Sequence, residues 1–302
     1  MANGKEIQGE KTKAQVFRER LLSTVALWVI VTSVFISMQA WAYFALILFL
    51  AAMGSWEFRK MLDGQPGKGC RTIGFLLGVL LLLVLWQQVL AGPSTVADFQ
   101  VEVLGLVLTV LGGFCWRFRV GIIGRESINA VTDGMMTYVY VPLLFGAFSL
   151  RLSFLPLPVE SAVPGAWLLL LMIGAAKFTD MGAYLTGSLI GKHKMAPKLS
   201  PGKTWEGFAG AIIFAQLAAW LVWFLADDEL AWLSAPHVAA LAFLIGVVAV
   251  AGDLSESVLK RSLGVKDSGK LMPGIGGVLD LVDSLCFAAP VTYFYLIFTG
   301  LV

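Results

Sequence analysis

Carboxylates, cations and glycines gather near the C-terminal end of an otherwise apolar chain of 302 residues. Asp253, Ser257 and Lys260 are spaced i, i+4 and i+7, so a helix would present an acid, a hydroxyl and a base along one face. Asp280 and Asp283 follow at i and i+3, after a glycine-rich stretch. Carboxylates suit a divalent metal, and lysine suits phosphate. These residues therefore predict a site that handles a phosphorylated substrate.

A second polar segment, residues 191–207, carries four lysines, two prolines and a Ser-Pro-Gly turn. The prolines prevent a regular helix through the segment. Its lysines alone are typical of a loop that touches anionic lipid headgroups. Lys203 and Thr204 differ, because they directly precede an apolar stretch that would begin a helix, where backbone N–H groups attract anions. We expect both residues to contact substrate phosphate.

Several of these residues also have a purely structural interpretation. Asp280 alone could simply favour the positive N-terminal end of a helix. Lys177 and Asp180, which share a helical face with Tyr184, could neutralise each other inside an apolar stretch. A membrane bundle gains nothing from burying such a pair, and ionisable residues in a bilayer are costly. We therefore expect a functional role, with Asp180 as a weaker, additional metal ligand.

The composition is that of a polytopic membrane protein. Hydrophobic residues make up 58% of the chain and charged residues 14%, whereas soluble domains carry about 25% charged residues. The cysteines (Cys70, Cys115, Cys286) and histidines (His193, His237) are far apart and match no metal-ligand spacing. The sequence therefore does not favour a histidine-based metal centre or a Ser-His-Asp triad.

Nine apolar stretches are long enough, or nearly so, to cross a bilayer. The sequence thus predicts an all-α, polytopic integral membrane helix bundle with about nine transmembrane helices, at residues 21–37, 39–56, 73–91, 101–116, 134–150, 165–185, 207–226, 237–252 and 284–302. The first five read as plain apolar helices with basic connections. We expect a cytoplasmic tail (1–20), an N-terminal scaffold (21–164) and a C-terminal catalytic bundle (165–302).

The distribution of lysine and arginine sets the expected orientation. With the N-terminus inside, nearly all of them fall in the cytoplasmic segments, whereas the opposite loops carry mainly acidic residues. The long polar leader does not match a cleaved signal peptide. We therefore expect an integral protein of a bacterial inner membrane, with its N-terminus and both polar segments on the cytoplasmic side.

The polar segments resemble the phosphatidate cytidylyltransferase family, also called CDP-diacylglycerol synthase. That family's signature runs S-x-x-K-R, four residues, K-D, a glycine, P-G-H-G-G and D-R-x-D. This chain matches it at residues 257–261, 266–269, 273–277 and 280–283, and the blocks at 180–184 and 200–207 are also similar. The resemblance is specific over about residues 175–290. Two positions depart from it: Ile275 replaces a histidine and Leu281 replaces an arginine.

The resemblance implies transfer of the cytidylyl group of CTP to phosphatidate in the inner leaflet, giving CDP-diacylglycerol and pyrophosphate. A lipid phosphate is already ionised near neutral pH, so the reaction needs no histidine base. The implied cofactor is Mg²⁺, with room for a second cation. The expected metal ligands are Asp253, Asp280, Asp283 and Asp180. The expected catalytic residues are Asp253, Lys260, Asp280 and Asp283. The expected substrate-binding residues are Lys203, Thr204, Ser257, Arg261, Lys266, Gly276 and Gly277.

Acyl chains would enter along the apolar flank of the sixth to ninth spans. Two other functions stay open at this point. A CTP-dependent lipid kinase would need the same metal and nucleotide contacts but would release CDP instead of pyrophosphate. A transporter or non-catalytic paralogue would use the polar cluster for binding alone, although transporters commonly show polar features in both halves. The D-G-x-x-A-R pattern of CDP-alcohol phosphotransferases is absent. No feature indicates nucleic-acid binding, and a homodimer is compatible with such a bundle.

Overall fold

The computed structural model describes residues 13–92, 99–265, 267–269 and 276–302, which are almost entirely helical. The elements along the chain are α1 (Lys13–Ser37), α2 (Ala40–Met61), α3 (Lys68–Ala91), α4 (Gln100–Val120), α5 (Arg125–Tyr138), the π-helical η2 (Val139–Ala147), α6 (Phe148–Ser153), α7 (Ala166–Ile190), β1 (Lys194–Ala196), β2 (Ser200–Thr204), α8 (Trp205–Ala226), the 3₁₀ turn η3 (Asp227–Leu230), α9 (Ala235–Ser262) and α10 (Val278–Phe298).

The predicted helical membrane bundle is confirmed. Within the described residues, eight helices are long and apolar enough to cross a membrane, and a shorter apolar helix, Val25–Ser37, occupies the first expected span. The chain is therefore an integral membrane protein. The helices extend beyond the predicted apolar stretches: α9 continues past Gly252 to Ser262, and α10 begins at Val278, ahead of residue 284. Both extensions carry the polar residues of the predicted site.

The fifth span is one continuous helix, Arg125–Ser153, with a π-helical segment at its centre. Pro142 lies inside that segment. Proline has no N–H and its ring collides with the preceding turn, so the helix widens locally rather than breaking. The widened segment packs against both α2 and α10.

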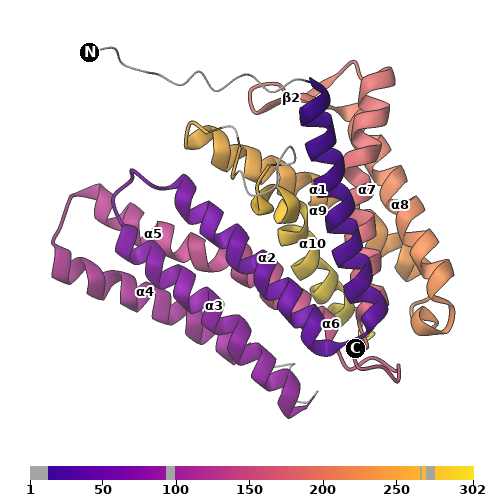
Figure 1. Cartoon of the computed structure of the whole chain (residues 1–302), viewed down its shortest axis with the longest axis horizontal. Coiled ribbons are helices and arrows are strands. Elements are labelled where there is room, and N and C mark those ends of the chain that lie inside the picture. The colour runs from indigo at the N-terminus through magenta and orange to yellow at the C-terminus, as the bar shows by residue number, and fades with distance from the viewer. Residues whose placement is uncertain (1–12, 93–98, 266, 270–275) are drawn as a thin grey trace.

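Helix α10 occupies the centre of the bundle (Figure 1). Helices α3, α4 and α5 pack together on one side, and α7, α8 and α9 on the other. Between these groups α10 contacts α2, η2, α7 and α9. Apolar residues are buried around much of its circumference, because it has protein neighbours on several faces.

The expectation that the first five spans are plain apolar helices is wrong. Buried charged residues occur on α2, α3, α4 and α6, and two of them form an ion pair between α4 and α6. Arg151 Nε donates to Glu102 Oε1 over 2.6 Å, and the two side chains are only 1% and 5% exposed. A buried charge requires such a partner, since desolvation is otherwise too costly.

Candidate functional site

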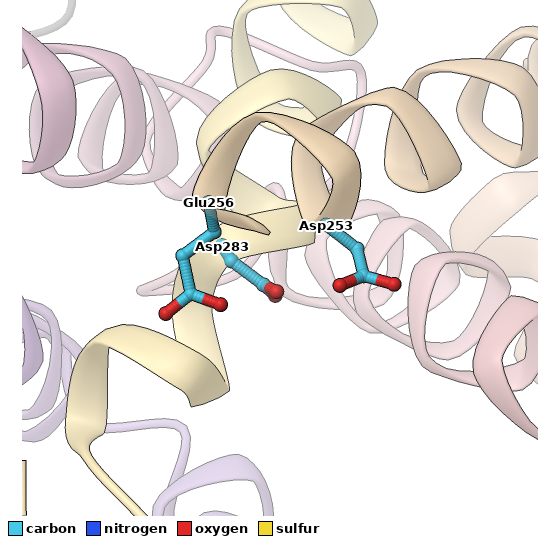
Figure 2. A group of neighbouring side chains, drawn as sticks. All are labelled: Asp253, Glu256 and Asp283. Carbon is cyan, nitrogen blue, oxygen red and sulfur yellow. The ribbon is translucent and has the colours of Figure 1, made fainter. Parts of the chain in front are cut away.

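Three carboxylates meet where α9 crosses α10. Asp253 and Glu256 lie one turn apart on α9, and Asp283 faces them from α10; Figure 2 shows Asp283 between the other two in that view. Ligand oxygens from the three residues all lie within 4.8 Å of one another. Glu256 and Asp283 are 1% and 5% exposed, whereas Asp253 is half-buried. We call these three residues the acidic group.

The two helices can cross closely because residue 252 is a glycine. A Cβ atom added to Gly252 would lie 2.7 Å from the carbonyl oxygen of Asp283 and 3.0 Å from Cα of Ser284. Real Cβ atoms essentially never approach other atoms so closely, so any larger residue would push α10 away from α9. Gly252 therefore sets the distance between the two sides of the acidic group.

Each member of the acidic group contacts its own lysine. Lys203, at the end of β2, lies 2.5 Å from Asp253 Oδ2. Lys260 Nζ, on α9, donates to Glu256 Oε2 over 2.6 Å. The third lysine, Lys177 on α7, has its Nζ 3.9 Å from Asp283 Oδ1 and donates to Ser284 Oγ over 3.0 Å. Lys177 is thus paired with α10 in these contacts, rather than with Asp180 on its own helix. Lysines from three different elements thus contact the three carboxylates.

Asp280, which was predicted to be a metal ligand, lies outside this acidic group. Its Oδ1 accepts from Lys260 Nζ over 2.7 Å, and its Oδ2 accepts from Ser268 Oγ and from the backbone N–H of Gly277, both over 2.7 Å. Its carboxylate closes the first turn of α10 and holds Lys260 from the side opposite Glu256. The geometry thus gives Asp280 a positioning role, and direct ligation would require it to exchange these partners.

A glutamate on α2 supports the start of α10. The residue before this helix is Gly277, which has no side chain to accept from the free N–H groups of the first turn. Glu57 on α2 supplies that acceptor: its Oε2 receives the N–H of Leu279 over 2.9 Å. A Cβ atom on Gly277 or on Gly269 would overlap the Glu57 carboxylate. Glycine is therefore needed at both positions because the Glu57 side chain leaves no room for a Cβ atom.

The remaining predicted residues are distributed around this centre. Thr204 is buried, and its Oγ1 accepts from the N–H of Gly207, so it caps α8. Ser257 is half-buried on α9, and Arg261 is exposed near the end of that helix. Gly276 has a φ of +123°, a conformation that side chains rarely adopt. Lys266, along with the departure at Ile275, lies outside the described residues.

A polar cavity adjoins the acidic group. It measures about 250 Å³, and we call it the polar cavity because its lining includes Asp180, Tyr184, Lys203, Thr204 and Asp253, although Ala183, Met195, Phe208 and Val250 line it as well. The β1–β2 hairpin forms one wall, as expected from the prolines that exclude a helix there. Asp180 therefore borders the same space as Asp253, although it belongs to a different helix.

The hairpin is fastened to α8 by Glu206. The Glu206 carboxylate accepts from the backbone N–H groups of Lys192 and His193 and lies 2.6 Å from the His193 ring. These contacts hold the hairpin, and with it Lys203, at the mouth of the polar cavity.

A second cavity, almost entirely apolar, borders the first turns of α10. It measures about 320 Å³ and is bounded by α1, α2, α7 and α10, with smaller contributions from η2 and α6. Among the residues that the structure describes, Lys177 is the only charged one in this lining. Because the same lysine contacts Asp283 and Ser284, this cavity also reaches the acidic group.

Comparison of this chain with known protein families shows the family to which it belongs. The model of the cytidylyltransferase family matches residues 18–299, nearly the whole chain. The chain belongs to the cytidylyltransferase family.

Relatives of this cytidylyltransferase family member agree with that assignment. A phosphatidate cytidylyltransferase of Pseudomonas aeruginosa is 31% identical over 91% of this chain and 95% of its own length. A phosphatidate cytidylyltransferase of Haemophilus influenzae is 40% identical over 51% of this chain and 54% of its own length. The uncharacterised protein YnbB of Escherichia coli (strain K12) is 36% identical over 57% of this chain and 54% of its own length. The last two alignments span about half of the relatives.

The acidic group of this family member is suited to a divalent cation. Glu256 Oε1 is buried and has no hydrogen-bond partner among the described residues, so one ligand atom is available. The spread of the oxygens, at most 4.8 Å, is comparable with the roughly 4.2 Å between opposite ligands at about 2.1 Å from Mg²⁺. Magnesium is commonly held by one or two carboxylates and completed by substrate phosphate. The donor set therefore fits Mg²⁺ at Asp253, Glu256 and Asp283.

Two residues of this site were missing from the sequence-based prediction. Glu256 lies three positions after Asp253, and this i, i+3 spacing of acids on a helix that leaves the membrane was the available signal. Glu57 was assigned to a cytoplasmic loop, but α2 continues to Met61 and buries it. A carboxylate directly after an apolar stretch was the signal there, although its partner, 222 residues away, could not be found from the sequence.

Replacing Gly252 with alanine is expected to weaken cation binding about tenfold, equivalent to roughly 1.4 kcal/mol, because α10 must move away from α9. Alanine favours a helix more than glycine does, so helix formation itself is not impaired. The measurement is the rise in melting temperature with added Mg²⁺ in detergent, which reports binding to the folded protein. Gly174→Ala is the matched control, since a Cβ there meets only Val222 Cγ2, at 3.7 Å. Equal Mg²⁺ responses in the two variants would contradict the role of Gly252.

Proposed function

We propose that this protein transfers the cytidylyl group of CTP to phosphatidate, giving CDP-diacylglycerol and pyrophosphate for phospholipid synthesis. A phosphate oxygen of phosphatidate attacks the α-phosphorus of CTP. A new P–O bond forms, the bond from that phosphorus to the bridging oxygen of the β-phosphate breaks, and pyrophosphate leaves with the bonding electrons. The observation that carries the proposal is that the acidic group adjoins a polar cavity through Asp253 and an apolar cavity through Lys177.

Different residues of the chain would bind CTP and hold the carboxylates in place. Lys203, at the mouth of the polar cavity, exchanges Asp253 for a phosphate of CTP. Lys260 stays between Glu256 and Asp280 and keeps these carboxylates in place. Positioning and charge compensation dominate such phosphoryl chemistry, because two polyanions must be brought together in line. Mg²⁺ held by the acidic group supplies positive charge at the reacting phosphates.

The proposed orientation places the polar cavity on the cytoplasmic side, where CTP is available. It rests on the concentration of lysine and arginine in the segments that include the hairpin and the end of α9. The relatives named phosphatidate cytidylyltransferase belong to bacteria, which supports assignment to a bacterial inner membrane.

Product analysis with purified protein tests the reaction. The protein in detergent is given CTP labelled at the α-phosphate, phosphatidate and Mg²⁺; label is expected in the lipid fraction, with one pyrophosphate released for each lipid labelled. CDP release with an unlabelled lipid product would instead identify a lipid kinase. Absence of any CTP- and Mg²⁺-dependent product would contradict the proposal, and the P. aeruginosa relative serves as the assay control.

A further inference from the structure

We propose that the apolar cavity between α1, α2, α7 and α10 holds an acyl chain of an anionic lipid, whose phosphate is bound by Lys177. The inference rests on the proposed function and assigns the lipid half of the reaction to particular residues. It differs from the sequence-based expectation, in which acyl chains lay along the sixth to ninth spans. Here the first and second spans contribute walls as well.

The cavity runs from the surface of the bundle into its core. Its lining includes Trp28 on α1, which is 57% exposed, and Val282 on α10, which is fully buried. Almost all other lining side chains are aliphatic or aromatic. A cavity with such walls is matched by an alkyl chain and not by a nucleotide or free phosphate. The exposed end lies on the apolar part of α1, Val25–Ser37, so we expect a lipid to enter from the bilayer.

Helix α1 closes one side of this cavity. Phe35 of α1 packs edge-on against Trp167 of α7, with 5.0 Å between ring centroids. Residues from Leu27 to Phe35 line the cavity along several turns of α1. These residues of α1 are thus part of the proposed lipid site.

Lys177 gives the cavity its preference for an anionic lipid. Its Nζ lies 3.0 Å from Ser284 Oγ and 3.9 Å from Asp283 Oδ1. A lipid that fills the apolar walls and carries phosphate at its end would place that phosphate between Lys177 and the acidic group. A neutral lipid has no group for this lysine, and a soluble phosphate ester leaves the walls unfilled. The class selected is therefore an acyl-chain lipid with a terminal phosphate.

Leu281 supports the same assignment. The family resemblance expects arginine at this position, yet Leu281 lines the apolar cavity together with Lys177. A leucine on α10 extends the apolar wall, and the cation reaches the cavity from α7 instead. In this chain the positive charge at the cavity therefore comes from position 177 and not from position 281.

Filling the cavity tests the acyl-chain site. Ile173 lines it one turn before Lys177, and Ile173→Trp is expected to lower kcat/KM for dioleoyl phosphatidate at least about tenfold relative to dihexanoyl phosphatidate. The matched control is Ile213→Trp on the exposed face of α8, which should leave the ratio unchanged. An unchanged long-to-short ratio in Ile173→Trp would overturn the site.

Moving the charge tests the phosphate contact. Lys177→Met is expected to raise KM for phosphatidate about tenfold, with little change in KM for CTP, because one charged contact is lost. The double variant Lys177→Met/Leu281→Arg should recover most of the lost affinity. A double variant as impaired as Lys177→Met, or an equal rise in both KM values, would contradict the assignment.

A labelling experiment separates this inference from the proposed reaction. Phosphatidate with a photoreactive acyl chain is expected to label residues of α1, α2, α7 or α10 in the wild-type protein and to lose that labelling in Ile173→Trp. Labelling confined to the outer face of α8 would overturn the cavity assignment even if turnover is normal. Specific labelling without any CTP-dependent product would instead leave the lipid site standing and contradict the proposed reaction.

Discussion

Asparagine in place of Asp283 is expected to slow cytidylyl transfer by about a thousandfold, equivalent to roughly 4 kcal/mol of transition-state stabilisation. The side chain keeps its shape and an oxygen for the N–H of Ser284, but the central carboxylate of the acidic group loses its charge. Mg²⁺ affinity and charge compensation at the reacting phosphates fall together. The measurement is the initial rate of lipid labelling from CTP, recorded over a range of Mg²⁺ concentrations.

The control for this substitution is Asp228→Asn, in the exposed turn η3 after α8. It removes the same charge at a residue that belongs neither to the acidic group nor to the lining of either cavity, and it should retain wild-type activity. Melting temperatures of both variants establish that they are folded. An Asp283→Asn protein with a rate within threefold of wild type would show that this carboxylate does not hold the cation.

Leucine in place of Glu57 is expected to lower activity about 10- to 100-fold and to destabilise the protein by roughly 1–3 kcal/mol, the cost of a buried donor left without a partner. The N–H of Leu279 loses its acceptor, so the first turn of α10 loosens. Asp280 and Asp283 both lie within the first two turns of this helix. Thermal unfolding in detergent and the CTP-dependent rate measure the two effects.

Glutamine at position 57 is the matched comparison. It keeps a carbonyl oxygen for Leu279 but carries no charge, so it should retain activity within about threefold and most of the stability. If Glu57→Gln were as inactive as Glu57→Leu, the charge and not the hydrogen bond would matter. Support of α10 by Glu57 would then be the wrong explanation.

The helical membrane architecture could be predicted from the sequence because it depends on local composition. Twenty apolar residues in a row indicate a span whatever surrounds them. The ends of α9 and α10 could not be predicted in this way. Hydropathy falls once charged residues appear, yet Asp253 and Glu256 continue α9, because each has a cationic partner on or near that helix.

The polar residues of the site could be recognised individually, but their pairings could not. The spacing of Asp253 and Asp283 from their neighbours indicated a metal site, and the structure brings both into the acidic group. The same reasoning treated Asp280 as their equivalent. Its position at the third residue of α10 turns its carboxylate back to Gly277, a difference decided by where the helix begins.

The other site contacts that could not be predicted join segments far apart in the sequence. Gly276 and Gly277 were expected to bind substrate, whereas Gly277 faces Glu57 and Ser268. Lys177 was considered with Asp180 on its own helix, but it contacts α10. Such pairings depend on how the helices pack, and a single sequence contains no record of that packing.

The ion pair between Glu102 and Arg151 has a consequence for biosynthesis. Glu102 lies in the first turn of α4 and Arg151 in the last turn of α6, at the same edge of the bundle. Helices that enter a bilayer one after another would leave each charge without its partner until the second had arrived. We therefore expect α4 to reach its final depth together with the following span, Arg125–Ser153, so that this pair couples the insertion of the two spans.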